Sequence, residues 1–289
     1  MSTPAPQELG SRIIEMACLA PSVHNSQPWR WRLSDTDTVE LWADRGRQLL
    51  ETDPRGRNLA LSCGAALHHG SVVARALGLT PDVTLEPDPT DPDLLARIRL
   101  SPGVTPPDAL ESLELIGQRR TDRRRFTTWP VPDRRLSLLG RSATGWGAYV
   151  VPLVESSARR RTDTLLDRAL RAQVSDGRAT SEQPEGRDHG IVEHTDGLLA
   201  ICTDRDDQGA WLRAGQALSA LWLRATRDGL SIVPLSQVIE FDETRDALAT
   251  DVLGGQAHPQ LLLRVGWQEI SRSDLPRTTR RPLADVLVS

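Results

Sequence analysis

The chain has 289 residues, with 39 acidic and 35 basic side chains and a formal net charge of −4 at pH 7. The sequence contains no lysine, so all 35 basic residues are arginines. This excludes a pyridoxal phosphate Schiff base and the P-loop lysine that contacts nucleotide phosphates. The acidic balance gives no general attraction to nucleic acid or to an anionic membrane.

The length predicts one large or two small domains. Cys18, Cys63 and Cys202 are scattered and lack a CxxC spacing, which favours neither a disulfide framework nor a structural zinc site. The first residues lack the basic and apolar regions of a secretory signal, and no apolar run approaches the length of a membrane span. We therefore expect a cytoplasmic protein that binds small molecules, without a nucleic-acid or membrane partner.

Hydrophobic periodicity predicts a mixture of helices and strands. In chain order, the sequence predicts helix 7–20, strands 29–33 and 39–43, helices 56–77, 108–117 and 134–143, strand 147–153, helix 157–173, strand 197–203, helix 207–228 and strand 260–267. The proline-rich stretches 81–92 and 102–107 are predicted loops. Segment 175–193, rich in Gly, Asp, Glu and Pro, is predicted to be a mobile excursion.

Two helical segments, 64–79 and 215–230, are identical at six of sixteen aligned positions without a gap. An apolar run, 94–100 or 261–266, follows each of them, and the second copy carries about sixteen extra residues in between. This pattern predicts an internal duplication with a first half at 1–106 and a second half at 107–289. A chance similarity of helix-forming composition is the alternative.

The segment 20–29, APSVHNSQPW, places several hydrogen-bonding side chains between two prolines. Such a connection is rigid and could bind a ligand with carbonyl and hydroxyl groups. An ordinary turn between a helix and a strand explains the same composition.

The segment 119–126, RRTDRRRF, carries five arginines in eight residues. A solvated run of charge is one interpretation. Nucleic-acid binding is disfavoured, since no aromatic residues are interleaved for base stacking. A phosphate monoester matches better in size, because guanidinium groups and a threonine hydroxyl can saturate its oxygens.

Two further segments attract attention, the apolar run 229–237 and the basic run 277–282. Backbone N–H groups at the end of the first run could donate to a ligand, and the second run is either a solvated tail or part of an anion site. The pair His68 and His69 has no acidic partner at metal-ligand spacing, so no metal site is predicted.

Together these segments resemble the nitroreductase-like flavoproteins, and within them the actinobacterial Acg-like group, in which one chain holds two nitroreductase-type halves. Four ordered motifs carry the resemblance: 20–29, 62–67 (SCGAAL), 119–126 and 280–283 (RRPL). The resemblance implies an α+β nitroreductase-like fold, built as an internally duplicated pseudo-dimer in one chain. It also implies FMN at the interface of the two halves.

The resemblance assigns site residues to three sets. The residues expected at the flavin's phosphate, ribityl chain and pyrimidine edge are Arg119, Arg120, Thr121 and Arg123, with Arg280 or Arg281 completing the phosphate contacts. Those expected from the opposite half are Pro21, Ser22, Asn25 and Gln27. The backbone expected near the ring's N5 edge belongs to Pro234, Leu235, Ser236 and Gln237. Arg123 takes a place where relatives often have lysine; its fixed charge would stabilise reduced, anionic flavin.

Neither the segment 7–12 nor the segment 141–147 repeats the matching motif of the other half, so we expect one FMN per chain. The implied activity is ping-pong hydride transfer from NADH or NADPH to a nitro compound or quinone, without a catalytic side chain, although His24 is placed near the pocket. The alternatives are an FMN-storage protein with segment 175–193 as a lid, or a pathway-specific oxidase or desaturase. A monomeric pseudo-dimer and a homodimer both remain open.

Overall fold

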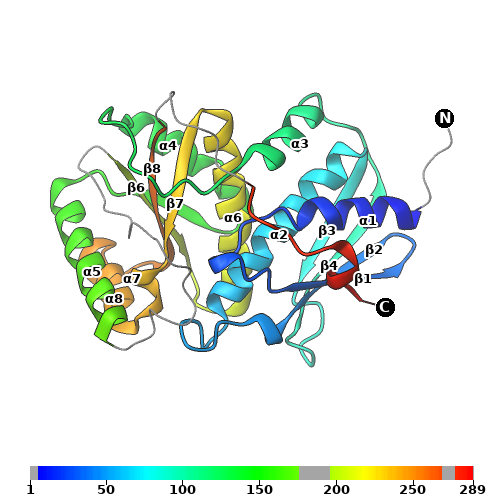
Figure 1. Cartoon of the computed structure of the whole chain (residues 1–289), viewed down its shortest axis with the longest axis horizontal. Coiled ribbons are helices and arrows are strands. Elements are labelled where there is room, and N and C mark those ends of the chain that lie inside the picture. The colour runs from blue at the N-terminus through cyan, green and yellow to red at the C-terminus, as the bar shows by residue number, and fades with distance from the viewer. Residues whose placement is uncertain (1–5, 176–195, 269–276, 289) are drawn as a thin grey trace.

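The computed structural model describes residues 6–175, 196–268 and 277–288. The molecule has two lobes, each with one sheet, and two long helices lie side by side where the lobes meet (Figure 1). Segment 175–193, expected to be mobile, falls almost wholly outside the described residues. None of the described helices has the length and apolar character needed to cross a membrane.

The first lobe holds a sheet in the order β3-β4-β2-β1-β9. Its strands are β1 (Trp29–Asp35), β2 (Thr38–Ala43), β3 (Leu79–Leu85), β4 (Leu94–Pro102) and the short β9 (Leu287–Val288). The alternation of apolar residues buries one face of the sheet, which includes Trp31, Leu41 and Ile98. This buried face forms the apolar core of the lobe together with α2.

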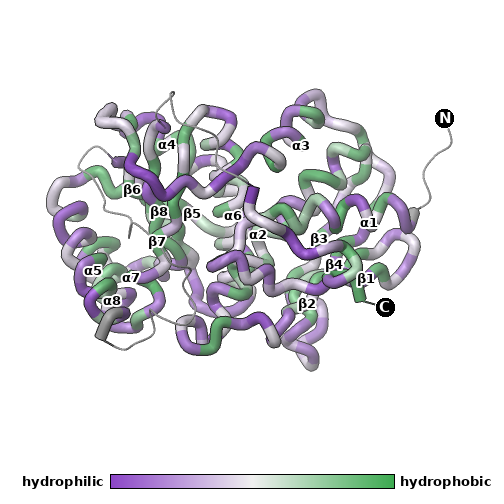
Figure 2. Tube along the Cα trace, viewed as in Figure 1, coloured by the Kyte–Doolittle hydropathy of each residue, from purple (hydrophilic) through white to green (hydrophobic). Residues whose placement is uncertain are grey.

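The second lobe holds a sheet in the order β5-β6-β8-β7. Its strands are β5 (Tyr149–Pro152), β6 (Gly197–Thr203), β7 (Leu230–Leu235) and β8 (His258–Trp267). The central strands β6 and β8 are buried on both faces, and they appear as a hydrophobic band inside the more hydrophilic α5 and α8 in Figure 2. In both lobes the first two strands pair, the fourth pairs with the second, and the third lies at the edge.

The helices α2 (Arg57–Ala76) and α6 (Gln208–Arg227) join the lobes. Glycines allow their backbones to approach: a Cβ at Gly64 would collide with the carbonyl of Leu212, and a Cβ at Gly215 would collide with that of Leu61. These two contacts are reciprocal, as in an interface with twofold symmetry. Gly64 and Gly215 are 151 positions apart, as are Leu61 and Leu212. His68 and Ser219 are related by the same offset, and they contact each other across the two helices, with an Nδ1 to Oγ distance of 2.8 Å.

The remaining helices cover the sheets and connections. They are α1 (Pro6–Ala17), α3 (Ala109–Gln118), α4 (Asp133–Arg141), α5 (Ser156–Ser175), α7 (Gln237–Glu240), α8 (Asp242–Ala247) and α9 (Leu283–Val286), with short turns η1 (Val23–Asn25), η2 (Arg45–Arg47), η3 (Thr144–Trp146) and η4 (Leu248–Val252). The elements α7, α8 and η4 lie between β7 and β8, in the region where the sequence showed extra residues.

Two strands that contain proline were not predicted from the sequence. Residues 81–85, predicted as loop, belong to β3, and residues 230–235 form β7 although Pro234 lies in them. Both are edge strands, where proline is tolerated because one side of the strand needs no ladder hydrogen bond. Composition alone therefore underestimated these two strands.

Packing crosses the predicted boundary at residue 106 in two places. Ile116 of α3 packs with Ile13 and Val73 of the first lobe, and β9 pairs in parallel with β1. The chain therefore returns to the first lobe at its end, which brings residues 277–282 beside the segment 20–29.

Candidate functional site

Two adjoining cavities lie between the lobes. The larger, polar cavity has a volume of about 390 Å³ and the smaller, more apolar one about 80 Å³. They share the lining residues Pro21, Ser22, His24, Thr121 and Arg123. Because these residues come from both halves, the site depends on how the lobes are packed.

The segment 20–29 forms one wall through the turn η1. His24, Asn25 and Gln27 have positive φ angles of 52°, 57° and 49°, a conformation that is rare for residues other than glycine. The turn is held by a hydrogen bond from Gln27 N to Ser22 Oγ (3.0 Å) and by one from Val23 N to Ser62 Oγ (3.3 Å). Strained backbone of this kind is concentrated at functional sites.

Arg119 lies at the buried end of the polar cavity and is only 5% exposed. Its guanidinium carbon lies 4.8 Å from the ring centre of Trp222, and its Nη2 donates weakly to Leu19 O (3.5 Å). Its Nε and Nη1 are buried without a hydrogen-bond partner. Burial, together with Arg280 and Arg120, lowers the pKa of Arg119 to about 9.

The arginines of segment 119–126 differ in direction because they have different contacts. Arg124 pairs with Asp122 at 2.7 Å and is thereby directed away from the cavity. The buried Arg264 of β8 donates to the carbonyls of Arg123 and Arg124, both at 3.2 Å. The arginine run is therefore anchored on the second sheet, and Arg264 is a positioning residue that the sequence did not reveal.

The C-terminal segment completes the polar cavity with Arg280. Its Nη1 donates to Asn25 Oδ1 (2.9 Å) and its Nη2 to Leu19 O (3.2 Å). Burial, followed by the charge of Arg120, lowers the pKa of Arg280, and its Nε has no hydrogen-bond partner. Arg280 and Arg119 thus present N–H groups around the same buried carbonyl of Leu19.

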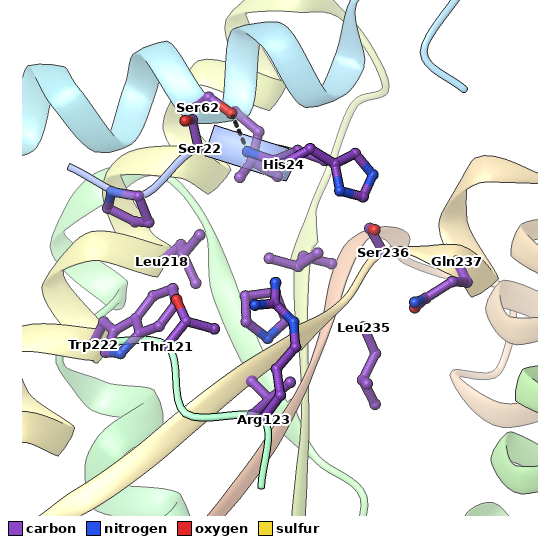
Figure 3. A pocket seen from close by; sticks show the side chains of 16 residues that line it. Ser22, His24, Ser62, Thr121, Arg123, Leu218, Trp222, Leu235, Ser236 and Gln237 are labelled. Carbon is purple, nitrogen blue, oxygen red and sulfur yellow. Dashed lines mark hydrogen bonds between the residues drawn. The ribbon is translucent and has the colours of Figure 1, made fainter. Parts of the chain in front are cut away.

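The end of β7 and the start of α7 line the smaller cavity. Figure 3 shows the His24 ring and the Ser236 hydroxyl toward the same side of the view, with the Arg123 guanidinium directed into the cavity. Gln237 Oε1 is buried and has no hydrogen-bond partner. Leu218 and Trp222 of α6 supply the apolar wall.

The structure brings most of the predicted site residues to the two cavities. Those that line at least one cavity are Pro21, Ser22, Asn25, Arg119, Arg120, Thr121, Arg123, Pro234, Leu235, Ser236, Gln237 and Arg280. Gln27 and Arg281 line neither cavity. Arg281 N donates to Gln27 Oε1 (2.8 Å) and Arg281 Nη1 to Asp44 Oδ2 (3.3 Å), so this pair joins the C-terminal segment to the first lobe.

The lining residues that were not predicted from the sequence include Leu61 and Ser62 of α2 and Leu218 and Trp222 of α6. They lie in the two repeated helices, but helical periodicity does not distinguish a residue that lines a cavity from one in the core. Arg277 and Thr278 also line the polar cavity.

The donors present fit FMN. Five arginines line the polar cavity (Arg119, Arg120, Arg123, Arg277 and Arg280), and no carboxylate is among the described residues that line it. Unpartnered, buried guanidinium N–H groups match a phosphate, since these groups form strong charge-assisted hydrogen bonds with phosphate oxygens. The adjoining cavity offers apolar walls for part of a ring. Within the described residues, no group of His, Cys, Asp and Glu is arranged to hold a metal ion.

Comparison with known proteins gives relatives over nearly the whole chain, although no family model matches. The "Putative NAD(P)H nitroreductase Rv3131" of Mycobacterium tuberculosis is 36% identical over 95% of this chain and 90% of its own length. The "Putative NAD(P)H nitroreductase acg" of the same organism is 33% identical over 94% and 93%, respectively.

Among solved structures, one is a protein of Anabaena variabilis whose name is "putative nitroreductase". The match covers 93% of this chain and 90% of that protein's chain. Its TM-score is 0.60 at 10% sequence identity, so it shows a shared fold. The α+β fold and the sequence relationships agree: the chain belongs to the nitroreductase-like family that includes Acg.

Proposed function

We propose that the chain binds one FMN between its two lobes and acts as an NAD(P)H-dependent oxidoreductase. The observation that carries this proposal is Arg119, whose buried guanidinium has two unpartnered N–H-bearing nitrogens and two further arginines as neighbours. Such an arrangement is unfavourable without an anion, because like charges and burial both disfavour the charged form. A bound phosphate would offset both the repulsion between the arginines and the cost of burying the charged guanidinium.

Each wall has a distinct task in this proposal. Arg119, Arg120 and Arg280 bind the phosphate, and Ser22 and Asn25 hold the connecting chain from the opposite half. Arg123 and the backbone of 234–237 orient the ring edge, where the bound flavin supplies hydride transfer at N5. The apolar side chains of Leu218 and Trp222 exclude water from the covered part of the ring.

The second part of the proposal concerns the substrates. The names of the relatives refer to NAD(P)H and to nitro compounds, and we extend these classes, together with quinones, to this chain. Because one open face would serve donor and acceptor in turn, we expect ping-pong kinetics. FMN storage without turnover is the competing function.

Anaerobic mixing of the purified holoprotein with NADPH or NADH separates the two functions. We expect the flavin absorbance near 450 nm, a property of FMN itself, to bleach within about seconds and to return when a quinone or nitro compound is added. If both nucleotides leave the flavin oxidised while dithionite reduces it, the oxidoreductase proposal fails and storage is favoured.

A further inference from the structure

We propose that His24 is the proton donor for the acceptor that is reduced in this site. The inference rests on the proposed oxidoreductase function and adds a residue to it. Reduction of a quinone by a hydride leaves negative charge on oxygen, and a proton must neutralise it. His24 is placed to supply this proton.

The described lining of the two cavities contains one imidazole, that of His24. The side chains that line the two cavities are aliphatic or belong to Ser, Thr, Asn, Gln, Arg, Trp, Pro and one histidine, His24. Among the described residues that line them, none is Asp, Glu, Cys or Tyr. Imidazole is the side chain whose ordinary titration lies near neutrality, so His24 is the one described lining group suited to proton transfer there.

The backbone of the turn η1 fixes the position of His24. His24 adopts a φ of 52°, and the turn is held on both sides, by Val23 N on Ser62 Oγ and by Asn25 Nδ2 on Thr279 O (3.0 Å). Histidine and asparagine are both among the residues that tolerate this left-handed conformation. The turn therefore holds the imidazole at the border of both cavities.

The position of the ring fits this role. In Figure 3 the imidazole and the Ser236 hydroxyl lie toward the same side of the view, and the Arg123 guanidinium points into the smaller cavity that all three residues line. Arg123 lines both cavities, whereas Arg119, Arg120, Arg277 and Arg280 line the polar cavity alone. A guanidinium group can stabilise an oxyanion but does not exchange protons near neutral pH.

The proposed step transfers a hydride and a proton to the acceptor. The acceptor gains a hydride, and so two electrons, from reduced flavin, which is oxidised. The imidazolium N–H of His24 breaks and its proton forms an O–H bond on the acceptor. Neutral imidazole then takes a proton from water.

The test uses His24→Asn in the full-length holoprotein, with His258→Asn, outside both cavities, as matched control. Flavin is first reduced with dithionite, so that the outcome does not depend on NAD(P)H turnover. Reoxidation by a quinone is then followed by stopped flow between pH 5.5 and 8.5.

For the native protein and the control we expect a rate that falls as pH rises through the titration of imidazole. For His24→Asn we expect a rate at least about 10-fold lower at pH 6 and independent of pH, in line with general acid catalysis, with unchanged FMN content. A native rate and pH profile in His24→Asn would overturn the proposal. If NAD(P)H fails to bleach the native protein, only the proposed function fails.

A second measurement does not use turnover. A phenolate, which mimics the reduced acceptor, is added to oxidised native holoprotein, and the His24 ring is followed by NMR, with assignment from the variant. We expect the imidazole titration to move to higher pH by at least about half a unit, because an adjacent anion favours the protonated form. An unchanged titration with phenolate bound would mean that His24 does not contact the acceptor.

Discussion

At the scale of single residues, Arg119 shows how a binding site is recognised by an unfavourable arrangement. A buried cation normally has a carboxylate partner or a dense set of acceptors. Arg119 has instead a tryptophan face, a weak bond to Leu19 O and two cationic neighbours. Its free N–H groups therefore define where the anionic end of a ligand belongs.

Replacing Arg119 by alanine should release FMN. Loss of about two charge-assisted hydrogen bonds corresponds to roughly 3 kcal/mol, or a Kd raised about 100-fold. Flavin fluorescence titration of the apoprotein measures this change. The exposed Arg125, a neighbour in the run that lines neither cavity, is the matched control, and equal losses for both alanine variants would contradict the placement of Arg119.

Asp53 provides a test of pH dependence at the start of α2. Its Oδ2 accepts from Leu59 N (2.8 Å), but burial dominates and raises the pKa of Asp53 to about 6 from 3.8. Since the folded-state pKa is raised, its stabilising contribution is present below about pH 4 and is lost as pH rises through 6.

The free energy of unfolding of the native protein should therefore fall relative to that of Asp53→Asn between pH 4 and 7. A shift of about two pKa units corresponds to at most about 3 kcal/mol. Urea denaturation at both pH values measures it, with the exposed Asp82→Asn as control. A constant difference between native protein and Asp53→Asn would show that Asp53 titrates normally.

At the scale of elements, the crossing of α2 and α6 sets the width of the site, because Leu61 and Ser62 of one helix and Leu218 and Trp222 of the other line the smaller cavity. The closest approach is at Gly64 and Gly215, where each helix meets a carbonyl of the other. Any added side chain must push the helices apart.

Gly215→Ala should lower the free energy of unfolding by about 2–3 kcal/mol, because the new methyl group meets backbone rather than a movable side chain. Gly117→Ala in α3 is the control, since its Cβ would meet nothing within 4 Å. This control should be neutral or stabilising by up to about 1 kcal/mol. Similar unfolding midpoints for the two variants would mean that the helices can separate at little cost.

At the scale of the whole molecule, the two lobes share an order of elements: a helix, a short turn, two strands, a long helix and two more strands. The second lobe adds α5 between its first two strands, and α7, α8 and η4 between its last two. The shared strand order and the reciprocal glycine contacts support our proposal that the halves arose by duplication. A second, symmetry-related cavity would then lie beside η3. There the ring of Trp146 packs edge-on against His68 at 4.6 Å and below Arg75 at 5.9 Å.

We therefore predict one FMN per chain at saturation. Trp146→Ala should lower the unfolding midpoint but leave the stoichiometry at one, because the start of α1 supplies no arginine pair for a second phosphate. The ratio of flavin to polypeptide is measured by absorbance after gel filtration. Two flavins in the native protein would contradict the prediction.

Much of this organisation could be predicted from the sequence because it depends on local patterns. Period-2 and period-3.6 hydrophobicity placed β1, β2, β6, α2 and α6 within a few residues of their observed bounds. The arginine run and the paired prolines around Ser22 pointed to an anion and to a rigid wall.

Three features could not be predicted: the edge strands with proline, the pairing of β9 with the first sheet, and the packing of α3 against the first lobe. They depend on which surfaces remain uncovered after the lobes form.

The sequence by itself determined the supply of chemistry: guanidinium groups as the sole basic side chains apart from histidine, and four motifs in a fixed order along the chain. Only the tertiary structure decided which members face the ligand. Arg280 and Arg281 are adjacent and chemically identical, yet one reaches the cavity and the other pairs with Asp44. Arg123 and Arg124 also differ, because Asp122, a near neighbour in the sequence, holds the second. The partners that direct Arg280 and Arg281 are Asn25 and Asp44, which are distant in sequence and come within reach through packing of the lobes.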